Sequence, residues 1–317
     1  MYPRPKALFF ALSRSATLTR FASQHGPGTP DSLAGRFVAG ETVEAAIDMS
    51  RRLQSQGRLV TLDHLDKRVT TLDESTAATT EYIRLIDVIM RAGIERNISL
   101  KLTQLGLDVD RATCLDNLRR ILEPAARQGF FIRINMEHSP YIEQTIDIFE
   151  TLWHYEYRNV GVALQSYLHR TEADLRRMNE LGARVRLVKG AYKEPSSAAL
   201  RHKDDRDRAF VRQAHLLLDS GTYPAIATHD PNIIEQVRTY ADARGLAKDR
   251  WEFQMLYGIR HDLQASLVSA GYRVRVYVPF GSGWFPYFMR RMGERPLNVG
   301  LALKPRAYAR GSINVRA

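Results

Sequence analysis

The sequence predicts an α/β fold, a (β/α)8 TIM-like barrel with helices before its first strand. Three observations predict this fold. From Arg58 onward, short apolar runs rich in β-branched residues alternate with amphipathic helical patterns. Eight such runs occur, spaced roughly 20 to 40 residues apart, and eight βα units are what this barrel requires. Each run also ends in polar side chains, as expected where strands meet at the mouth of a barrel.

The first 30 residues contain four Lys or Arg residues and no acidic residue. This composition resembles a mitochondrial transit peptide, but its continuation into further helical pattern favours a basic amphipathic helix. The apolar side of that helix would hold Leu8, Phe9, Leu12 and Phe21. The longest apolar run, residues 7–12, is too short for a secretory signal or a membrane span, so we expect a soluble protein.

Two short helices are predicted between this segment and the first strand. The sequence GPGTP at residues 26–30 breaks the first helix. Residues 32–37 and 42–53 then carry helical patterns, and Thr42 is the expected N-cap of the second. We therefore expect residues 1–57 to form a helical segment that packs on a barrel of residues 58–317, within one domain overall.

The eight predicted strands cover residues 59–63, 98–102, 130–136, 160–165, 185–189, 225–229, 252–256 and 274–278. A doubly wound open sheet is the alternative arrangement of alternating strands and helices. No G-x-G-x-x-G motif opens the first unit, and after Gly281 and Gly283 the place of the third glycine is held by Pro286. The barrel is therefore favoured.

The polar residues at the strand ends are Asp63, Lys101, Asn135, Glu137, Gln165, Lys189, Thr228, His229, Gln254 and Tyr277. In a barrel, the carboxyl ends of all strands meet on one face, where the active site of this fold lies. A strand that simply ends in water explains any one of these residues equally well. Their presence at all eight predicted strands favours a functional rim.

The last predicted helix carries two adjacent arginines beside an aromatic run at residues 284–288. Tyr287, Arg290, Arg291 and Glu294 follow i, i+3, i+4, i+7 spacing and share one helical face. Planar guanidiniums suit bidentate binding of a small carboxylate, and a neighbouring phenol can wall off a ring. The alternative is a solvated basic helix end whose aromatic residues belong to the core.

Composition narrows the class of protein. The 317 residues carry a net charge of +11, and their 44% hydrophobic content is ordinary for a globular enzyme. The single cysteine, Cys114, excludes an internal disulfide and indicates a reducing compartment such as the cytoplasm. Basic residues are often interleaved with acids, as at 201–208, so no binding of nucleic acid is expected. Peripheral contact with the anionic inner face of the cell membrane stays open.

The signature motifs of several enzyme classes are missing from the sequence. It has no H-E-x-x-H motif or histidine pair at metal spacing, no P-loop and no G-x-S-x-G elbow. Metal, nucleotide-triphosphate and nucleophilic chemistry therefore find little support, and no metal ion is expected. The rim is basic, with Lys101, Arg186, Lys189, His229 and the arginine pair, and it suits a phosphate-bearing cofactor and a carboxylate substrate.

Six segments of this chain resemble bacterial monofunctional proline dehydrogenase. They are RFVAGE at 36–41, SLKLTQLG at 99–106, RLVKGAY at 186–192, ATHD at 227–230, FQMLYG at 253–258 and YFMRR at 287–291. The resemblance covers nearly the whole chain, and several motifs at compatible spacing make it specific. The same catalytic domain recurs in bifunctional proline-utilisation proteins.

The resemblance implies a distorted barrel over residues 58–317 that binds FAD noncovalently, with a final helix over its mouth. It implies oxidation of L-proline to Δ1-pyrroline-5-carboxylate by hydride transfer from C5 of proline to N5 of FAD. A quinone would accept the electrons, and a separate pyrroline-5-carboxylate dehydrogenase would take the product. Two alternatives stay open: a relative that prefers another cyclic amino acid such as 4-hydroxyproline, and a non-redox basic barrel that binds anions or nucleic acid.

Residue by residue, the resemblance implies a substrate site and a cofactor site. Arg290 and Arg291 would clamp the proline carboxylate, with Lys101 beside it. The slot for the proline ring would be shaped by Leu187, Tyr192, Tyr277 and Tyr287. The positions that match FAD contacts are Met136, Gln165, Lys189, Gly190, Ala191, Thr228 and His229. Arg186 matches the arginine near the reactive edge of the flavin. The predicted catalytic residues are Arg186, Asn135 and Lys101.

Two positions depart from the family pattern. Asn135 stands where the family commonly has an aspartate, which would pair with Lys101. Asparagine keeps the hydrogen bonding but loses the charge, which leaves the site more cationic. The first strand ends in LDK at residues 65–67, where the family usually has Gly-Glu. These departures bear on substrate identity and rate more than on the fold.

Overall fold

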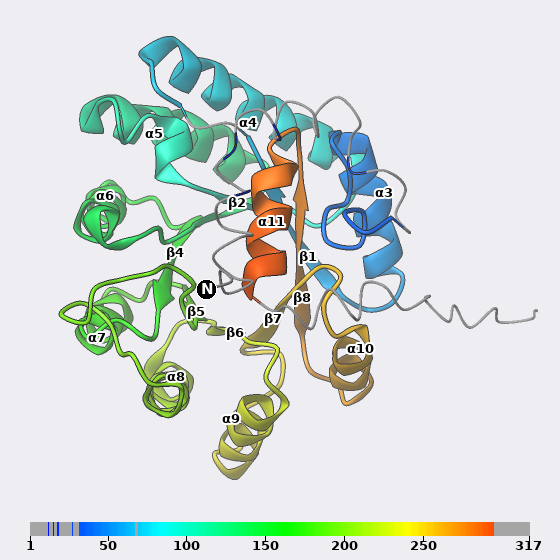
Figure 1. The fold of residues 1–317 in the computed structure, drawn as a ribbon, viewed down its shortest axis with the longest axis vertical. Helices are drawn as coiled ribbons and strands as arrows, with labels where there is room; N and C mark the ends of the chain where they lie inside the picture. Colours follow the sequence, from blue (N-terminus) through cyan, green and yellow to red (C-terminus); the bar gives the residue numbers. More distant parts are fainter. Residues whose placement is uncertain are drawn as a thin grey trace, which may run out of the picture.

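A closed barrel of eight parallel strands forms the centre of the molecule in a computed structural model (Figure 1). The structure describes residues 32–66 and 69–294, together with Leu12, Ser15, Leu18 and Pro27. The strands follow one another in chain order around the barrel, and the last pairs with the first. The predicted (β/α)8 fold is confirmed, and an open doubly wound sheet is excluded. In this described part of the chain, no helix combines the length and apolar character needed to cross a membrane.

The strands are β1 Leu59–His64, β2 Asn97–Leu100, β3 Phe131–Ile134, β4 Val160–Gln165, β5 Val185–Val188, β6 Ala225–Ala227, β7 Glu252–Leu256 and β8 Val274–Phe280. All eight predicted strands are present. The predictions for β2, β3, β5 and β6 run one or two residues too far, because the chain leaves the sheet at the barrel mouth just where its polar residues begin. The barrel is firmly closed, because β1 and β8 pair along the whole length of β1.

The helices are α3 Val43–Gln54, α4 Leu72–Ala92, α5 Arg111–Arg127, α6 Ile142–His154, α7 Thr171–Glu180, α8 Lys203–Ser220, α9 Pro231–Ala243, α10 His261–Ser269 and α11 Trp284–Glu294, with 3-10 turns η1 Leu102–Leu105 and η2 Ser139–Tyr141. Helices α4 to α10 surround the barrel (Figure 1). Their amphipathic faces pack on the apolar, outward faces of the strands, where the main core lies.

The segment before the barrel matches the prediction only in part. Thr42 caps α3 as expected, because its hydroxyl accepts the backbone N–H of Ala45 at 3.3 Å. The helix predicted over 32–37 is wrong, since these residues form turns. The chain next contacts β8 of the barrel, where the N–H of Ala39 donates to the carbonyl of Pro279 at 2.9 Å. The predicted first helix, with Leu8, Phe9 and Phe21, lies outside the described residues.

The interior of the barrel is polar rather than aliphatic. At its amino end, the guanidinium of Arg275 donates to both carboxylate oxygens of Glu252, at 2.8 and 3.0 Å. Farther along, Arg186 on β5 lies in register with Ala163 on β4 and Ala225 on β6. Residues in register point to the same face of a sheet, so two methyl groups flank the long arginine side chain. The small neighbours leave Arg186 room to extend inside the barrel.

The single cysteine supports a prediction about reactivity. Cys114 on α5 is fully buried, and its thiol donates to the carbonyl of Leu102 at 3.4 Å. Burial raises the pKa of the Cys114 thiol to about 12, and the Glu137 carboxylate adds to the rise. The thiolate is the reactive form, so native protein should resist iodoacetamide up to about pH 9 and react once unfolded. Mass spectrometry with and without denaturant checks this, and rapid labelling of native protein would contradict it.

Candidate active site

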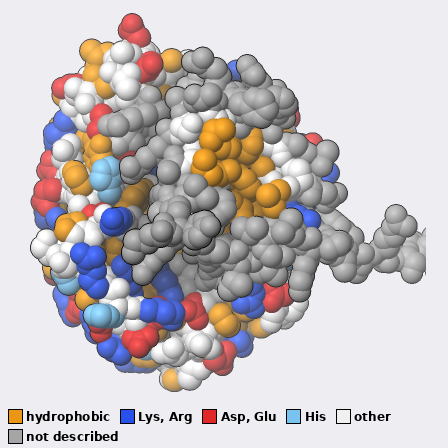
Figure 2. All heavy atoms as spheres, in the orientation of Figure 1, with side chains coloured by type: hydrophobic (Ala, Val, Ile, Leu, Met, Phe, Trp, Pro, Cys, Tyr) orange, Lys and Arg blue, Asp and Glu red, His pale blue; other side chains and the backbone are white. Residues whose placement is uncertain are grey.

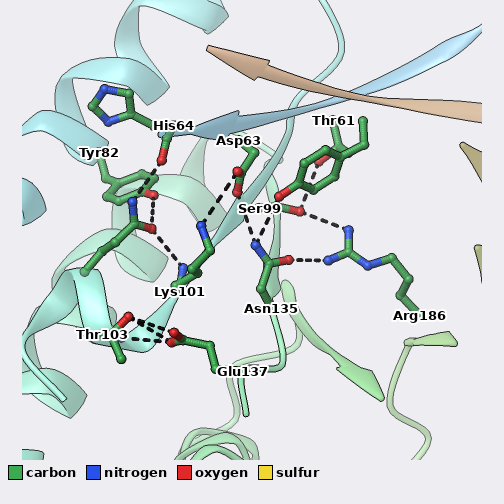
Figure 3. Close-up of polar contacts among 12 residues, drawn as sticks. Thr61, Asp63, His64, Tyr82, Ser99, Lys101, Thr103, Asn135, Glu137 and Arg186 are labelled. Atoms are coloured by element: carbon green, nitrogen blue, oxygen red, sulfur yellow. Dashed lines mark hydrogen bonds and ion pairs between the residues drawn. The ribbon is translucent and has the colours of Figure 1, made fainter. Parts of the chain in front are cut away.

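Polar side chains from five strands meet at the carboxyl end of the barrel (Figure 3). The cluster consists of Asp63 of β1, Ser99 of β2, Lys101 directly after β2, Asn135 directly after β3, Arg186 of β5 and Tyr277 of β8. Every member touches at least one other member through a hydrogen bond, an ion pair or a ring contact. The rim predicted from the sequence therefore contains a connected network, which we call the Asn135 cluster.

Asn135 lies at the centre of this cluster and uses both ends of its amide. Its Nδ2 donates to Oδ1 of Asp63 at 3.1 Å and to the hydroxyl of Tyr277 at 3.3 Å. Its Oδ1 accepts a hydrogen bond from Nη2 of Arg186 (Figure 3). A carboxylate only accepts and a guanidinium only donates, so these partners admit one orientation of the amide.

Arg186 brings a buried cation into the cluster. Its Nη1 donates to Oγ of Ser99 at 3.2 Å, and its guanidinium lies 5.4 Å from the centre of the Tyr277 ring. Burial lowers the pKa of Arg186, while the nearby Tyr277 and Asp63 oppose that shift. A guanidinium stays charged even so, which places a fixed positive charge inside the barrel mouth.

Lys101 pairs with a carboxylate other than the one expected from the family pattern. Its Nζ lies 3.9 Å from Oδ2 of Asp63, which is only 1% exposed. In the family pattern, an aspartate at position 135 would carry the negative charge beside this lysine. Here Asn135 is neutral, and Asp63 supplies the charge from the neighbouring strand β1.

Tyr277 is a protonated phenol at neutral pH. Burial raises the pKa of Tyr277 well above its ordinary value, and the negative charge of Asp63 raises it further. The hydroxyl therefore stays available as a hydrogen-bond donor at the cluster.

Helix α11 carries the arginine pair predicted from the sequence. It follows β8 directly and lies in front of the barrel (Figure 1), held where the N–H of Gly283 donates to the carbonyl of Leu65 at 2.9 Å. The Arg291 guanidinium lies 5.3 Å from the centre of the Tyr287 ring. The side chain of Glu294, predicted on the same face, lies outside the described residues.

The arginine pair of α11 and two carboxylates near the barrel mouth, Glu137 and Asp63, act on the same tyrosine. The side chain of Tyr192 is 37% exposed, but neighbouring protein atoms still reduce the hydration of its hydroxyl. This desolvation raises the pKa of Tyr192 to about 12, and the Glu137 carboxylate raises it as well. The charges of Arg290 and Arg291 work in the opposite direction on the same hydroxyl. The charges of α11 therefore lie close enough to act on the segment after β5.

Leu187 does not join the residues that these contacts bring together. It is fully buried in the main core. Side chains alternate along a strand, and Arg186 points into the barrel, so Leu187 faces the surrounding helices.

The positions predicted to contact a flavin lie on the side of the barrel mouth formed by β3 to β6 and the residues that follow these strands. Gln165 is buried and donates to the carbonyl of Glu137 at 2.7 Å. His229 accepts the N–H of Leu256 at Nε2 over 2.8 Å, which makes Nδ1 the protonated nitrogen of a neutral ring. Thr228 and Met136 are buried, whereas Ala191 is exposed. These residues supply donors, acceptors and apolar contacts around one opening.

Lys189 is already partly neutralised. Its Nζ donates to Asp207 at 2.7 Å and to Asp230 at 3.1 Å. An ammonium group has three N–H bonds, so one remains for another acceptor.

Gly190 follows Lys189 with a φ of 92°, and a Cβ there would lie 2.1 Å from the ring of Tyr167. Only glycine lets the chain turn so close to that ring.

The sequence placed Asp63 and Glu137 on the polar rim without an individual role, and it did not single out Ser99. Ser99 precedes Lys101 by two residues, and this spacing alone predicts that both face the barrel interior. The Thr103 hydroxyl lies 2.9 and 3.0 Å from the two carboxylate oxygens of Glu137 and shares its one hydrogen between them, while burial raises the pKa of Glu137. No local pattern marks Asp63 apart from its polar character at a strand end.

With this geometry established, comparison with known proteins identifies the family. Residues 46–300 match the family model described as proline dehydrogenase. The chain belongs to the proline dehydrogenase family. Membership makes it an enzyme, an oxidoreductase of proline metabolism, and sets aside the alternative of a non-redox barrel.

Individual relatives agree with this assignment. The chain is 39% identical to proline dehydrogenase 2 of Bacillus subtilis over 296 residues, which cover 93% of this chain and 96% of that protein. It is 40% identical to proline dehydrogenase of Deinococcus radiodurans over 277 residues, or 86% and 89% of the two chains. Proline utilization A from Bdellovibrio bacteriovorus has the same fold, with a TM-score of 0.76 and 24% identity over 82% of this chain and 32% of that one.

Proposed function

We propose that this enzyme oxidises L-proline to Δ1-pyrroline-5-carboxylate with noncovalently bound FAD and passes the electrons to a quinone. One observation carries the proposal: a buried network of Asp63, Asn135, Arg186 and Tyr277 lies at the barrel mouth, and the helix that carries the arginine pair, α11, follows β8 directly. It combines cations for an anionic substrate with a fixed positive charge deep in the site.

The carboxylate of proline would be bound by Arg290 and Arg291, with Lys101 beside it. Two guanidiniums and an ammonium group satisfy a carboxylate better than water does in a partly enclosed site, because charge-assisted hydrogen bonds strengthen there. Tyr192, Tyr277 and Tyr287 would wall the slot for the ring. Binding at both ends of a small rigid substrate fixes its orientation, which is what a transfer between two ring systems requires.

The residues at the mouth fit a flavin. The Nε of Arg186 is buried and has no hydrogen-bond partner among the described residues, and Lys189 has one N–H to spare. We propose that FAD is held by Met136, Gln165, Arg186, Lys189, Gly190, Ala191, Thr228 and His229. When bound, FAD supplies an acceptor for the hydride removed from C5 of proline.

The protein's own residues prepare the reaction. Arg186 stabilises negative charge that arises in the site as electrons leave the substrate. Proline must react as a neutral amine, and the surrounding cations lower the pKa of its ammonium group by repulsion. Water has little access to the network because its side chains are buried.

The test of the proposed function is anaerobic titration of the purified protein. It should be yellow, should release FAD on denaturation, and should lose its visible absorbance on addition of L-proline. Parallel titration with 4-hydroxyproline separates the two substrates by their rates. Colourless protein, or yellow protein that neither amino acid bleaches, would overturn the proposal.

The partners follow from the same proposal. A soluble quinone added to the proline-reduced enzyme should restore the visible absorbance, and we propose that the natural quinone is reached by peripheral contact with the inner face of the cell membrane. The product would pass to a separate pyrroline-5-carboxylate dehydrogenase.

Flotation with anionic and neutral vesicles tests the proposed membrane contact, because a basic protein surface should bind only the anionic vesicles.

Asn135→Asp is expected to fold, to keep its flavin and to alter the pH dependence of proline oxidation. The new carboxylate would lie beside Asp63, which Asn135 now approaches to 3.1 Å. A second negative charge stabilises the ammonium form of bound proline, so the acidic limb of the kcat profile should move up by on the order of one pH unit. Steady-state rates over pH check this, and complete loss of flavin would contradict the position given to residue 135.

A further inference from the structure

Asp63 is the carboxylate on which the Asn135 cluster depends. Its Oδ1 accepts from Asn135, while Oδ2 is buried, 3.9 Å from the Lys101 ammonium, and has no hydrogen-bond partner in the described part of the chain. The neighbouring carboxylate of Glu137 differs, because Thr103 satisfies it. A buried charge with so few hydrogen bonds is costly unless nearby cations compensate it. Here those cations are Lys101 and Arg186.

The negative charge of Asp63 also determines how the next two side chains lie. A carboxylate accepts hydrogen bonds and never donates, so it attracts the Nδ2 end of Asn135. The Oδ1 end is thereby turned to Arg186, which only donates. A flipped amide would set oxygen against carboxylate and N–H against guanidinium, so both contacts would be repulsive. The orientation of Arg186 thus depends on the charge of a residue that it does not contact directly.

We infer that Asp63 is a positioning residue of the active site: through the amide of Asn135 it aims Arg186, and it balances the charge of Lys101. The inference rests on the proposed function, since it assigns Asp63 a role in the same reaction. It also explains how this chain keeps a balanced site with an amide at position 135. The negative charge lies on β1, and the neutral hydrogen-bonding group lies after β3.

The decisive experiment exchanges the two residues. Asp63→Asn removes the charge, Asn135→Asp adds one, and the double variant Asp63→Asn with Asn135→Asp restores one carboxylate and one amide in reversed positions. In the double variant, the new amide can donate to the new carboxylate, which then accepts from Arg186. Asp205→Asn is the matched control, because it removes an aspartate whose partner, Arg208, lies on the exposed surface of α8.

The two single variants are expected to shift the acidic limb of the kcat profile in opposite directions. Asp63→Asn should lower kcat for proline by at least about tenfold and move the acidic limb of the kcat profile down by on the order of one pH unit, because a more cationic site disfavours the substrate ammonium. Asn135→Asp should move that limb up. The double variant should return the limb to the wild-type position and recover most of kcat, and Asp205→Asn should change nothing.

Unfolding temperature and flavin content are measured for each variant alongside the rates. The inference is overturned if Asp63→Asn keeps the wild-type rate and pH profile, or if the double variant is no closer to wild type than the worse single variant. If Asp63→Asn does not fold, the double variant must fold and turn over proline for the inference to survive. Failure of the proposed function is distinguishable, because the wild-type protein itself would then lack flavin or fail to bleach with proline.

Discussion

Replacement of Arg290 or Arg291 by alanine is expected to raise the Michaelis constant for proline by roughly 30- to 150-fold. The estimate corresponds to the loss of a charge-assisted interaction with the substrate carboxylate, about 2 to 3 kcal/mol. Flavin content should change little, since the proposed flavin contacts come from β3 to β6 and the residues after them, whereas the arginines come from α11. Steady-state kinetics with proline, together with the ratio of flavin to protein absorbance, measure both effects.

A control and a second variant sharpen this prediction. Arg176→Ala on α7 removes an exposed arginine that pairs with Glu172 at 3.0 Å, and it should leave the kinetics unchanged. Arg291→Lys keeps the charge but loses the planar fork and its contact with the Tyr287 ring, so its Michaelis constant should fall between wild type and Arg291→Ala. Unchanged constants in both alanine variants would refute the carboxylate clamp.

Replacement of Gly258 by alanine is expected to destabilise the protein by at least about 3 kcal/mol. Gly258 has a φ of 81°, and a Cβ there would lie 1.6 Å from the carbonyl oxygen of Arg36. A rotamer change cannot relieve this overlap, because the obstructing atom belongs to the backbone. The residues around Arg36 must move away from the loop after β7, or the loop must distort.

Gly245→Ala provides a matched control for the strain of a positive φ. Gly245 has a φ of 63°, but nothing lies within 4 Å of an added Cβ. This variant should lose only about 1 to 2 kcal/mol, so the difference between the two variants isolates the close approach of the two segments. Denaturant unfolding measures both, or inactivation rates where unfolding is irreversible. Equal destabilisation would contradict the predicted backbone clash.

The close approach of Gly258 to Arg36 also connects the stability of the protein to the substrate site. Phe37 follows Arg36 and packs on Phe288 of α11, with ring centres 6.1 Å apart. Trp284 at the start of α11 donates to Glu41 at 2.8 Å, so the segment before α3 supports the helix that carries the arginine pair. Any Gly258→Ala protein that folds should therefore also show a raised Michaelis constant for proline.

Much of this architecture was predictable because it depends on local pattern. Eight apolar runs with regular spacing predicted eight strands, and the i, i+3, i+4 spacing of Tyr287, Arg290 and Arg291 predicted one face of α11. Thr42 was predictable as a cap because its hydroxyl bonds within one turn. The prediction failed at residues 32–37, which form turns with hydrogen bonds to Ser32, before Ala39 contacts β8.

The sequence alone therefore established the barrel, the polar rim at its mouth and the family motifs, because periodicity and motif spacing are properties of neighbouring residues. The partners within the rim depended on barrel closure. Asp63 and Asn135 are 72 residues apart and Asn135 and Tyr277 are 142 apart, yet each pair is joined by one hydrogen bond. Pairing of β1 with β2 gave Lys101 the carboxylate of Asp63, and folding placed Lys189 between two aspartates. Such contacts follow from strand register and side-chain packing in three dimensions, which no local pattern encodes.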